Sequence, residues 1–118
     1  MGLDTSHNCW NGSYSTFNRF RFCLAKQIGI DLSEYSGYGN GTKDLELIQH
    51  ELMPLLNHSD CDGQLTVEES KSIIIGLNKV LDNYNDKIEA DYDFKERVIK
   101  FRDGCIDAIS KNEIIDFH

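Results

Sequence analysis

Apolar side chains recur at intervals of three or four residues in four parts of the chain, and this pattern predicts four amphipathic helices. The four segments are residues 13–28, 44–53, 67–81 and 92–110. Each carries an apolar stripe: Phe17, Phe20, Leu24 and Ile28 in the first, Leu45, Ile48 and Leu52 in the second, Ile73, Ile74, Leu77, Val80 and Leu81 in the third, and Phe94, Val98, Phe101, Cys105 and Ile109 in the fourth. Four such stripes can bury one common core.

Helix-breaking residues fall where the stripes end. Gly29 follows the first stripe, and Pro54 follows the second, where it is expected to end or kink the helix. Residues 31–43 and 82–91 are polar or rich in glycine, which predicts connecting loops.

The last five residues, 114–118, are short and β-prone, and the first twelve show no helical period. These two ends are suited to pairing with each other. We therefore expect a single domain over residues 1–118, mainly α, with about four helices and a small two-stranded β element that joins the termini.

A candidate binding loop lies between the second and third predicted helices. If Gly63 is the sixth residue of an EF-hand loop, the ligand positions 1, 3, 5, 7, 9 and 12 are His58, Asp60, Asp62, Gln64, Thr66 and Glu69. Leu65 then takes the eighth position, where an apolar side chain turns inward. The spacing predicts an EF-hand-like helix-loop-helix that binds a divalent cation, with calcium as the first candidate.

One position departs from this pattern. The first residue of such a loop is an Asp, whereas here it is His58, and an imidazole nitrogen is a poor ligand for calcium. We expect any calcium affinity to be weak. The alternative is a metal-free turn in which Thr66 caps the next helix and Glu69 closes a capping box. The sequence contains no second loop of this kind.

The charge balance narrows the range of partners. The chain has 20 acidic and 12 basic residues and a net charge of −8. A negative protein of this kind is poorly suited to neutralising phosphates of nucleic acids or to docking on anionic membranes. We expect neither a nucleic-acid nor a membrane partner.

The cysteine and histidine residues allow a second metal hypothesis. The four cysteines form no Cys-x-x-Cys pair, which favours buried thiols and a reducing, cytoplasmic location. His58 and Cys61 have a spacing that suits zinc, and Cys9, His7 or His118 are further candidates. A structural zinc site normally has two close ligand pairs, and the sequence has one, so zinc ranks below calcium.

No enzyme signature accompanies these residues. The chain lacks a nucleophile elbow, a phosphate-binding loop and a metalloprotease motif. Cys61 stands between Asp60 and Asp62, whose negative charge disfavours a reactive thiolate. We expect a binding protein rather than an enzyme.

Several segments together resemble a known family. Gly2 to His7, Tyr14 to Arg21, the central His58 to Gly63 (His-Ser-Asp-Cys-Asp-Gly) and Asp116 to His118 are similar to a family of small uncharacterised bacteriophage and bacterial proteins. This resemblance brings no known activity. Its phage setting implies an accessory role, such as counter-defence against a host.

A second function follows from the aromatic and cationic residues near the N-terminus. Trp10, Tyr14, Arg19 and Arg21 are the residue types that a pocket for an anionic nucleotide requires, with aromatic faces for a base and guanidinium groups for phosphate. The alternative function is therefore a counter-defence protein that sequesters a small host signalling nucleotide or blocks a host defence protein.

Overall fold

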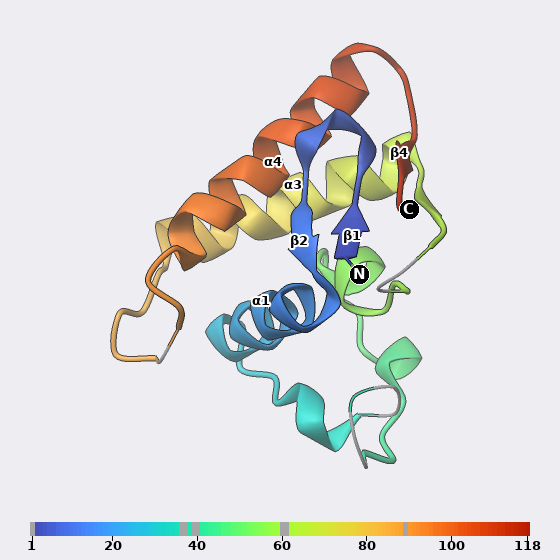
Figure 1. The fold of residues 1–118 in the computed structure, drawn as a ribbon. Helices are drawn as coiled ribbons and strands as arrows, with labels where there is room; N and C mark the ends of the chain where they lie inside the picture. Colours follow the sequence, from blue (N-terminus) through green and yellow to red (C-terminus); the bar gives the residue numbers. More distant parts are fainter. Residues whose placement is uncertain (1, 36–37, 39–40, 60–61, 89) are drawn as a thin grey trace.

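The computed structural model describes residues 2–35, 38, 41–59, 62–88 and 90–118. Two long helices, α3 (Val67–Asp82) and α4 (Phe94–Ser110), run side by side in opposite directions and form one layer (Figure 1). The third long helix, α1 (Tyr14–Gln27), contacts α4 and the short α2 (Met53–Leu56). The predicted mainly α fold is confirmed.

The N-terminal segment forms a hairpin. Strand β1 (Gly2–Asp4) pairs antiparallel with β2 (Asn11–Ser13), and the short 3-10 turn η1 (Ser6–Asn8) connects them. Ser13 accepts a hydrogen bond from the Thr16 amide at 3.1 Å and thereby caps α1.

The C-terminal strand joins both the N-terminus and the candidate loop. The amides of Asp4 and His118 donate to each other's carbonyl oxygens, both at 2.9 Å, beside a bridge between Thr5 and Phe117. The predicted pairing of the termini is thus confirmed. In addition, β4 (Ile115–Asp116) pairs antiparallel with β3 (Gln64–Leu65), which lies inside the loop.

The prediction of a helix over residues 44–53 is wrong. This segment contains one 3-10 turn, η3 (Leu45–Leu47), which Asp44 caps by accepting from the Glu46 amide at 2.9 Å. Ile48 then has extended backbone angles. Pro54 lies in the first turn of α2, where its missing N–H leaves no helical bond unmade, so it begins a helix rather than ending one.

The core is a single cluster that is rich in aromatic rings. Trp10, 2% exposed, packs against Phe17 and Phe20 with ring centroids 5.2 and 5.1 Å apart. Phe20 also lies 6.2 Å from Phe101 of α4. Cys9 and Cys105 are free and buried, as the sequence suggested. These contacts fix α1 and the N-terminal hairpin against α4.

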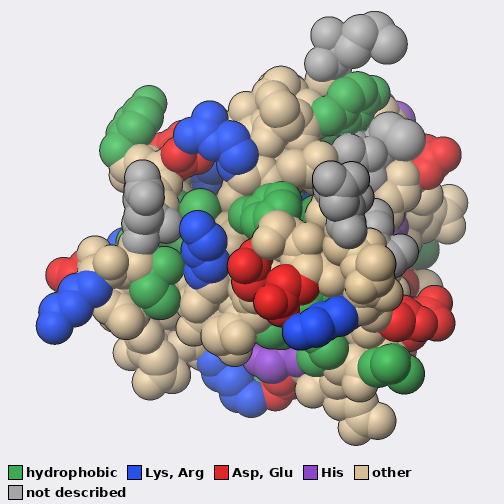
Figure 2. Space-filling model, turned by 90° about the horizontal axis from the view of Figure 1, so that it is seen from below, with side chains coloured by type: hydrophobic (Ala, Val, Ile, Leu, Met, Phe, Trp, Pro, Cys, Tyr) green, Lys and Arg blue, Asp and Glu red, His purple; other side chains and the backbone are tan. Residues whose placement is uncertain are grey.

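The surface is mixed in charge. On the face seen in Figure 2, described acidic and basic side chains lie interspersed with apolar ones and form no large patch of one sign. None of the helices in the described part of the chain has the length and apolar character that a membrane crossing requires.

Candidate functional site

The loop between α2 and α3 has several features of the predicted binding loop. Gly63 has φ +96°, in the left-handed region that favours glycine and that the sharp turn requires. Leu65 is fully buried, and α3 begins two residues later at Val67. The Phe117 amide donates to the Gly63 carbonyl oxygen at 2.9 Å, so the C-terminal strand holds the turn in place.

The side chain of His58 occupies the inside of this loop. Its Nε2 lies 3.0 Å from the Gln64 carbonyl oxygen, and its Nδ1 lies 2.8 Å from the Ser59 carbonyl oxygen. The ring also packs on Phe117 at 4.2 Å between centroids. A Cβ at residue 63 would lie 3.2 Å from the imidazole Cε1, so glycine is needed both for the turn and for the ring.

The two contacts of His58 are chemically informative. Carbonyl oxygens only accept hydrogen bonds, so in either neutral tautomer one ring nitrogen donates to a carbonyl oxygen and the other lies close to a second one. Two backbone oxygens are therefore gathered around one small ring. The imidazole occupies the position beside the Gln64 carbonyl oxygen where a bound cation would lie.

Thr66 and Glu69 form the capping box of α3. The Thr66 amide donates to Glu69 Oε1 at 2.9 Å, and the Glu69 amide donates to Thr66 Oγ1 at 3.1 Å. The capping-box interpretation is confirmed. In this arrangement Glu69 Oε1 accepts a hydrogen bond from the backbone, and bidentate coordination of a cation, as at the twelfth position of an EF-hand loop, requires it to release the Thr66 amide.

The remaining loop positions divide into described and undescribed residues. Asp62 is exposed, and its amide lies 3.4 Å from Ser59 Oγ. Asp60 and Cys61 lie outside the described residues. Within the described ranges, no group of three or more His, Cys, Asp or Glu side chains is placed to hold a metal ion. The cation hypothesis therefore stays a prediction that depends on rearrangement of His58 and Glu69.

Arg21 contacts the first residue of the loop through its guanidinium group. It is 3% exposed, and its Nη1 donates to the His58 carbonyl oxygen at 2.5 Å and approaches the Leu55 carbonyl oxygen at 3.5 Å. Its guanidinium lies over the rings of Phe17 and Tyr38, at 4.6 and 5.0 Å from their centroids. Arg21 thus satisfies carbonyl groups at the end of α2 and acts as part of the core.

The four residues predicted to bind a nucleotide are not brought into one site. Trp10 is buried in the core, with the guanidinium of Arg97 over its ring at 4.5 Å. Arg21 is also buried, whereas Arg19 is exposed and paired with Asp91. Tyr14 is half-buried at the start of α1. Of the four, only Arg19 lines a described surface hollow.

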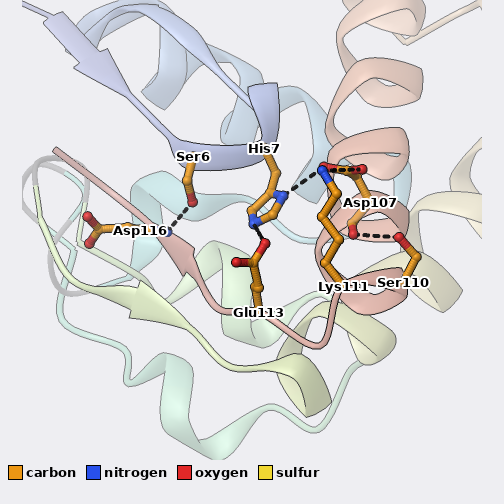
Figure 3. Close-up of polar contacts among 7 residues, drawn as sticks. All are labelled: Ser6, His7, Asp107, Ser110, Lys111, Glu113 and Asp116. Carbon is orange, nitrogen blue, oxygen red and sulfur yellow. Dashed lines mark hydrogen bonds and ion pairs between the residues drawn. The ribbon is translucent and has the colours of Figure 1, made fainter.

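The two other histidines of the zinc hypothesis have separate surroundings. The His118 ring is exposed, with Nδ1 at 3.7 Å from Asp116 Oδ2. His7 lies between two carboxylates, with Nδ1 at 2.7 Å from Asp107 Oδ2 and Nε2 at 3.4 Å from Glu113 Oε1 (Figure 3). His7 therefore ties the N-terminal turn to the end of α4.

Sequence reasoning missed the His7 cluster because its members are about a hundred positions apart. His7 has φ +60°, a left-handed conformation that is uncommon outside glycine, and its ion pairs help to hold it. The hydrogen bond from His7, supported by Lys111, lowers the pKa of Asp107. With both nitrogens engaged and its side chain 9% exposed, His7 serves as a structural tie.

Comparisons with known proteins gave no match to any family model, curated protein or solved structure.

Proposed function

We propose that this protein is a small, non-enzymatic binding module whose His58–Glu69 loop responds to a divalent cation of the calcium type. The observation that supports this best is the convergence of two carbonyl oxygens, those of Ser59 and Gln64, on the single imidazole of His58. A loop interior in which backbone oxygens surround one small polar ring is chemically suited to a hard metal ion.

Binding requires the imidazole to leave and an ion to take its place. The Gln64 carbonyl then gains a metal contact in exchange for the His58 hydrogen bond. Glu69 gives up one capping bond, a loss of about 1 kcal/mol, while the Thr66 hydroxyl continues to cap α3. Asp62 and Glu69 supply negative charge. The competition from His58 places the expected affinity near the millimolar end of the EF-hand range.

The resemblance to small phage and bacterial proteins supports an accessory role of this module during infection, in the cytoplasm of the host. The alternative role is counter-defence through sequestration of a small host signalling nucleotide or through binding of a host defence protein. Native mass spectrometry of the protein purified from infected cells separates these: a retained metal ion supports the first, and a retained nucleotide or protein supports the second.

The cation proposal is tested by amide NMR during calcium addition. The amides of Gly63 and Gln64 are expected to shift in the wild type and to stay unchanged in Asp62→Ala. Asp103→Ala, on the exposed surface of α4, removes the same charge outside the loop and is the matched control. Equal calcium shifts in Asp62→Ala and wild type would contradict a site that uses this carboxylate.

A further inference from the structure

The described residues of the connector between α3 and α4 make polar contacts with α1 near both of its ends. At one end, the Gln27 side chain exchanges two hydrogen bonds with the Asn85 backbone, at 3.1 and 3.0 Å. At the other end, Arg19 forms an ion pair with Asp91. The described parts of the connector therefore lie against α1 at Asn85 and at Asp91.

Two surface hollows, lined by residues of α1, of the turn after it and of the connector, share Lys26. One has a cavity volume of about 340 Å³ and is lined by Arg19, Phe22, Cys23, Lys26, Ala90 and Asp91. The other has a volume of about 380 Å³ and is lined by Lys26, Gly29, Ile30, Asp31 and Ile88. We call the two together the Lys26 groove. Each hollow alone is within the size range of small-molecule sites.

The two carboxylates that line the groove have polar partners, whereas its lysine differs from them. Asp91 is paired with Arg19, and Asp31 accepts from the amide and the hydroxyl of Ser33, at 3.0 and 2.7 Å. Lys26 is exposed, and no described carboxylate lies within ion-pair distance of its amine. Among the described residues that line the groove, Lys26 is thus a cation with no carboxylate partner, and it lines both hollows.

The rest of the lining is apolar. Ile30 and Ile88 stand at one end as half-buried aliphatic side chains, and Phe22 lies toward the other. Burial raises the pKa of the Cys23 thiol, so this group is a neutral part of the floor at physiological pH. Aliphatic walls suit a hydrocarbon body better than a base, which needs hydrogen-bond partners for its edges.

From this arrangement we infer that the Lys26 groove binds a small amphipathic organic anion, with its anionic group at Lys26 and its aliphatic body against Ile30 and Ile88. Exposed ion pairs contribute little by themselves, so the apolar contact provides most of the affinity and Lys26 sets the orientation and the charge preference. This site shares no residue with the cation loop and stands independently of it.

Decanoate is the probe, used below its micelle-forming concentration and followed by amide NMR in about 0.15 M salt, where the net negative charge of the protein is screened. Acetate supplies the head group alone and decanol the apolar body alone. Decanoate is expected to shift the amides of Lys26, Ile30 and Ile88. Acetate is expected to bind at least about tenfold more weakly, and decanol about two- to fivefold more weakly.

Lys26→Glu and Ile88→Ser test the two ends, and Lys100→Glu on the exposed side of α4 is the control for net charge. Ile88→Ser is expected to weaken decanoate binding by about tenfold, Lys26→Glu by about fivefold, and Lys100→Glu by less than about twofold. The inference is overturned if decanol binds as well as decanoate, if Lys100→Glu weakens binding as much as Lys26→Glu, or if the shifts lie outside the groove. Unchanged melting temperatures confirm that the variants remain folded.

Discussion

The Nε2 atom of His58 lies 3.0 Å from the carbonyl oxygen of Gln64, the backbone group that a cation in this loop would contact. The first residue of the loop thus reaches across to its seventh residue. In an EF-hand loop both residues bind the same ion. Here the His58 side chain contacts the Gln64 carbonyl oxygen directly, so a side chain of the loop itself closes the loop. This relationship explains how the turn keeps its shape in the absence of an ion.

Arg21 links this loop to the core, and its removal is expected to destabilise the fold. Arg21→Ala removes the guanidinium donor to the His58 carbonyl oxygen and empties the space between Phe17 and Tyr38, a loss of about 2–4 kcal/mol. Arg19→Ala, in an exposed ion pair, is expected to change stability by less than about 1 kcal/mol. Urea denaturation measures both. Similar values for the two variants would show that Arg21 has no special structural role.

Gly104 allows the N-terminal turn to approach α4. A Cβ at this position would lie 2.4 Å from Cys9 Sγ and 2.8 Å from the His7 carbonyl oxygen. Gly104→Ala is therefore expected to destabilise the protein by about 1–3 kcal/mol, although alanine has the higher helix propensity. Lys100→Ala in the same helix is the control. If Gly104→Ala had a higher melting temperature than wild type, the N-terminal turn would have moved away from the added methyl group at little cost in stability.

The ion pair between His7 and Asp107 is expected to make stability depend on pH in the acid range. The pKa of Asp107 is lowered in the folded protein, mainly by the hydrogen bond from His7. Its contribution to stability is therefore complete above the ordinary Asp value of 3.8 and is lost as the pH falls through the lower folded value.

Asp107→Asn removes this contribution. The variant is expected to be less stable than wild type at pH 6, and the difference is expected to shrink and vanish in acid. Asp103→Asn, an exposed neighbour on α4, changes the net charge equally and is the comparison. Melting temperatures across the acid range measure the effect. A difference that stays constant with pH would argue against the ion pair as its source.

The long helices could be predicted from sequence because their apolar stripes are regular. Helix α1 was expected over residues 13–28 and spans Tyr14–Gln27, and α3 begins at the expected Val67. The segment 44–53 has the same spacing of apolar residues, but Asp44 favours a capped 3-10 turn and Pro54 fits the first turn of α2. Periodicity alone does not separate these outcomes in a short segment.

The candidate site was predictable only where its chemistry is local. Gly63 and the capping box of Thr66 and Glu69 follow from fixed offsets along the chain. The approach of Phe117 to His58 and the burial of Arg21 depend on tertiary packing, and no local pattern encodes them. For the same reason, the attachment of the connector to α1 through Gln27 could not be anticipated.

The most direct test of the cation proposal is the melting temperature of wild type and His58→Asp in calcium and in chelator. The substitution removes the imidazole from the loop and restores a carboxylate at the first ligand position. In millimolar calcium we expect His58→Asp to melt about 10 °C or more above its value in chelator, and the wild type to rise by only a few degrees. Asp62→Ala in the His58→Asp background should remove the increase. If His58→Asp melts at the same temperature in calcium and in chelator, the loop is a capped turn and the proposal is wrong.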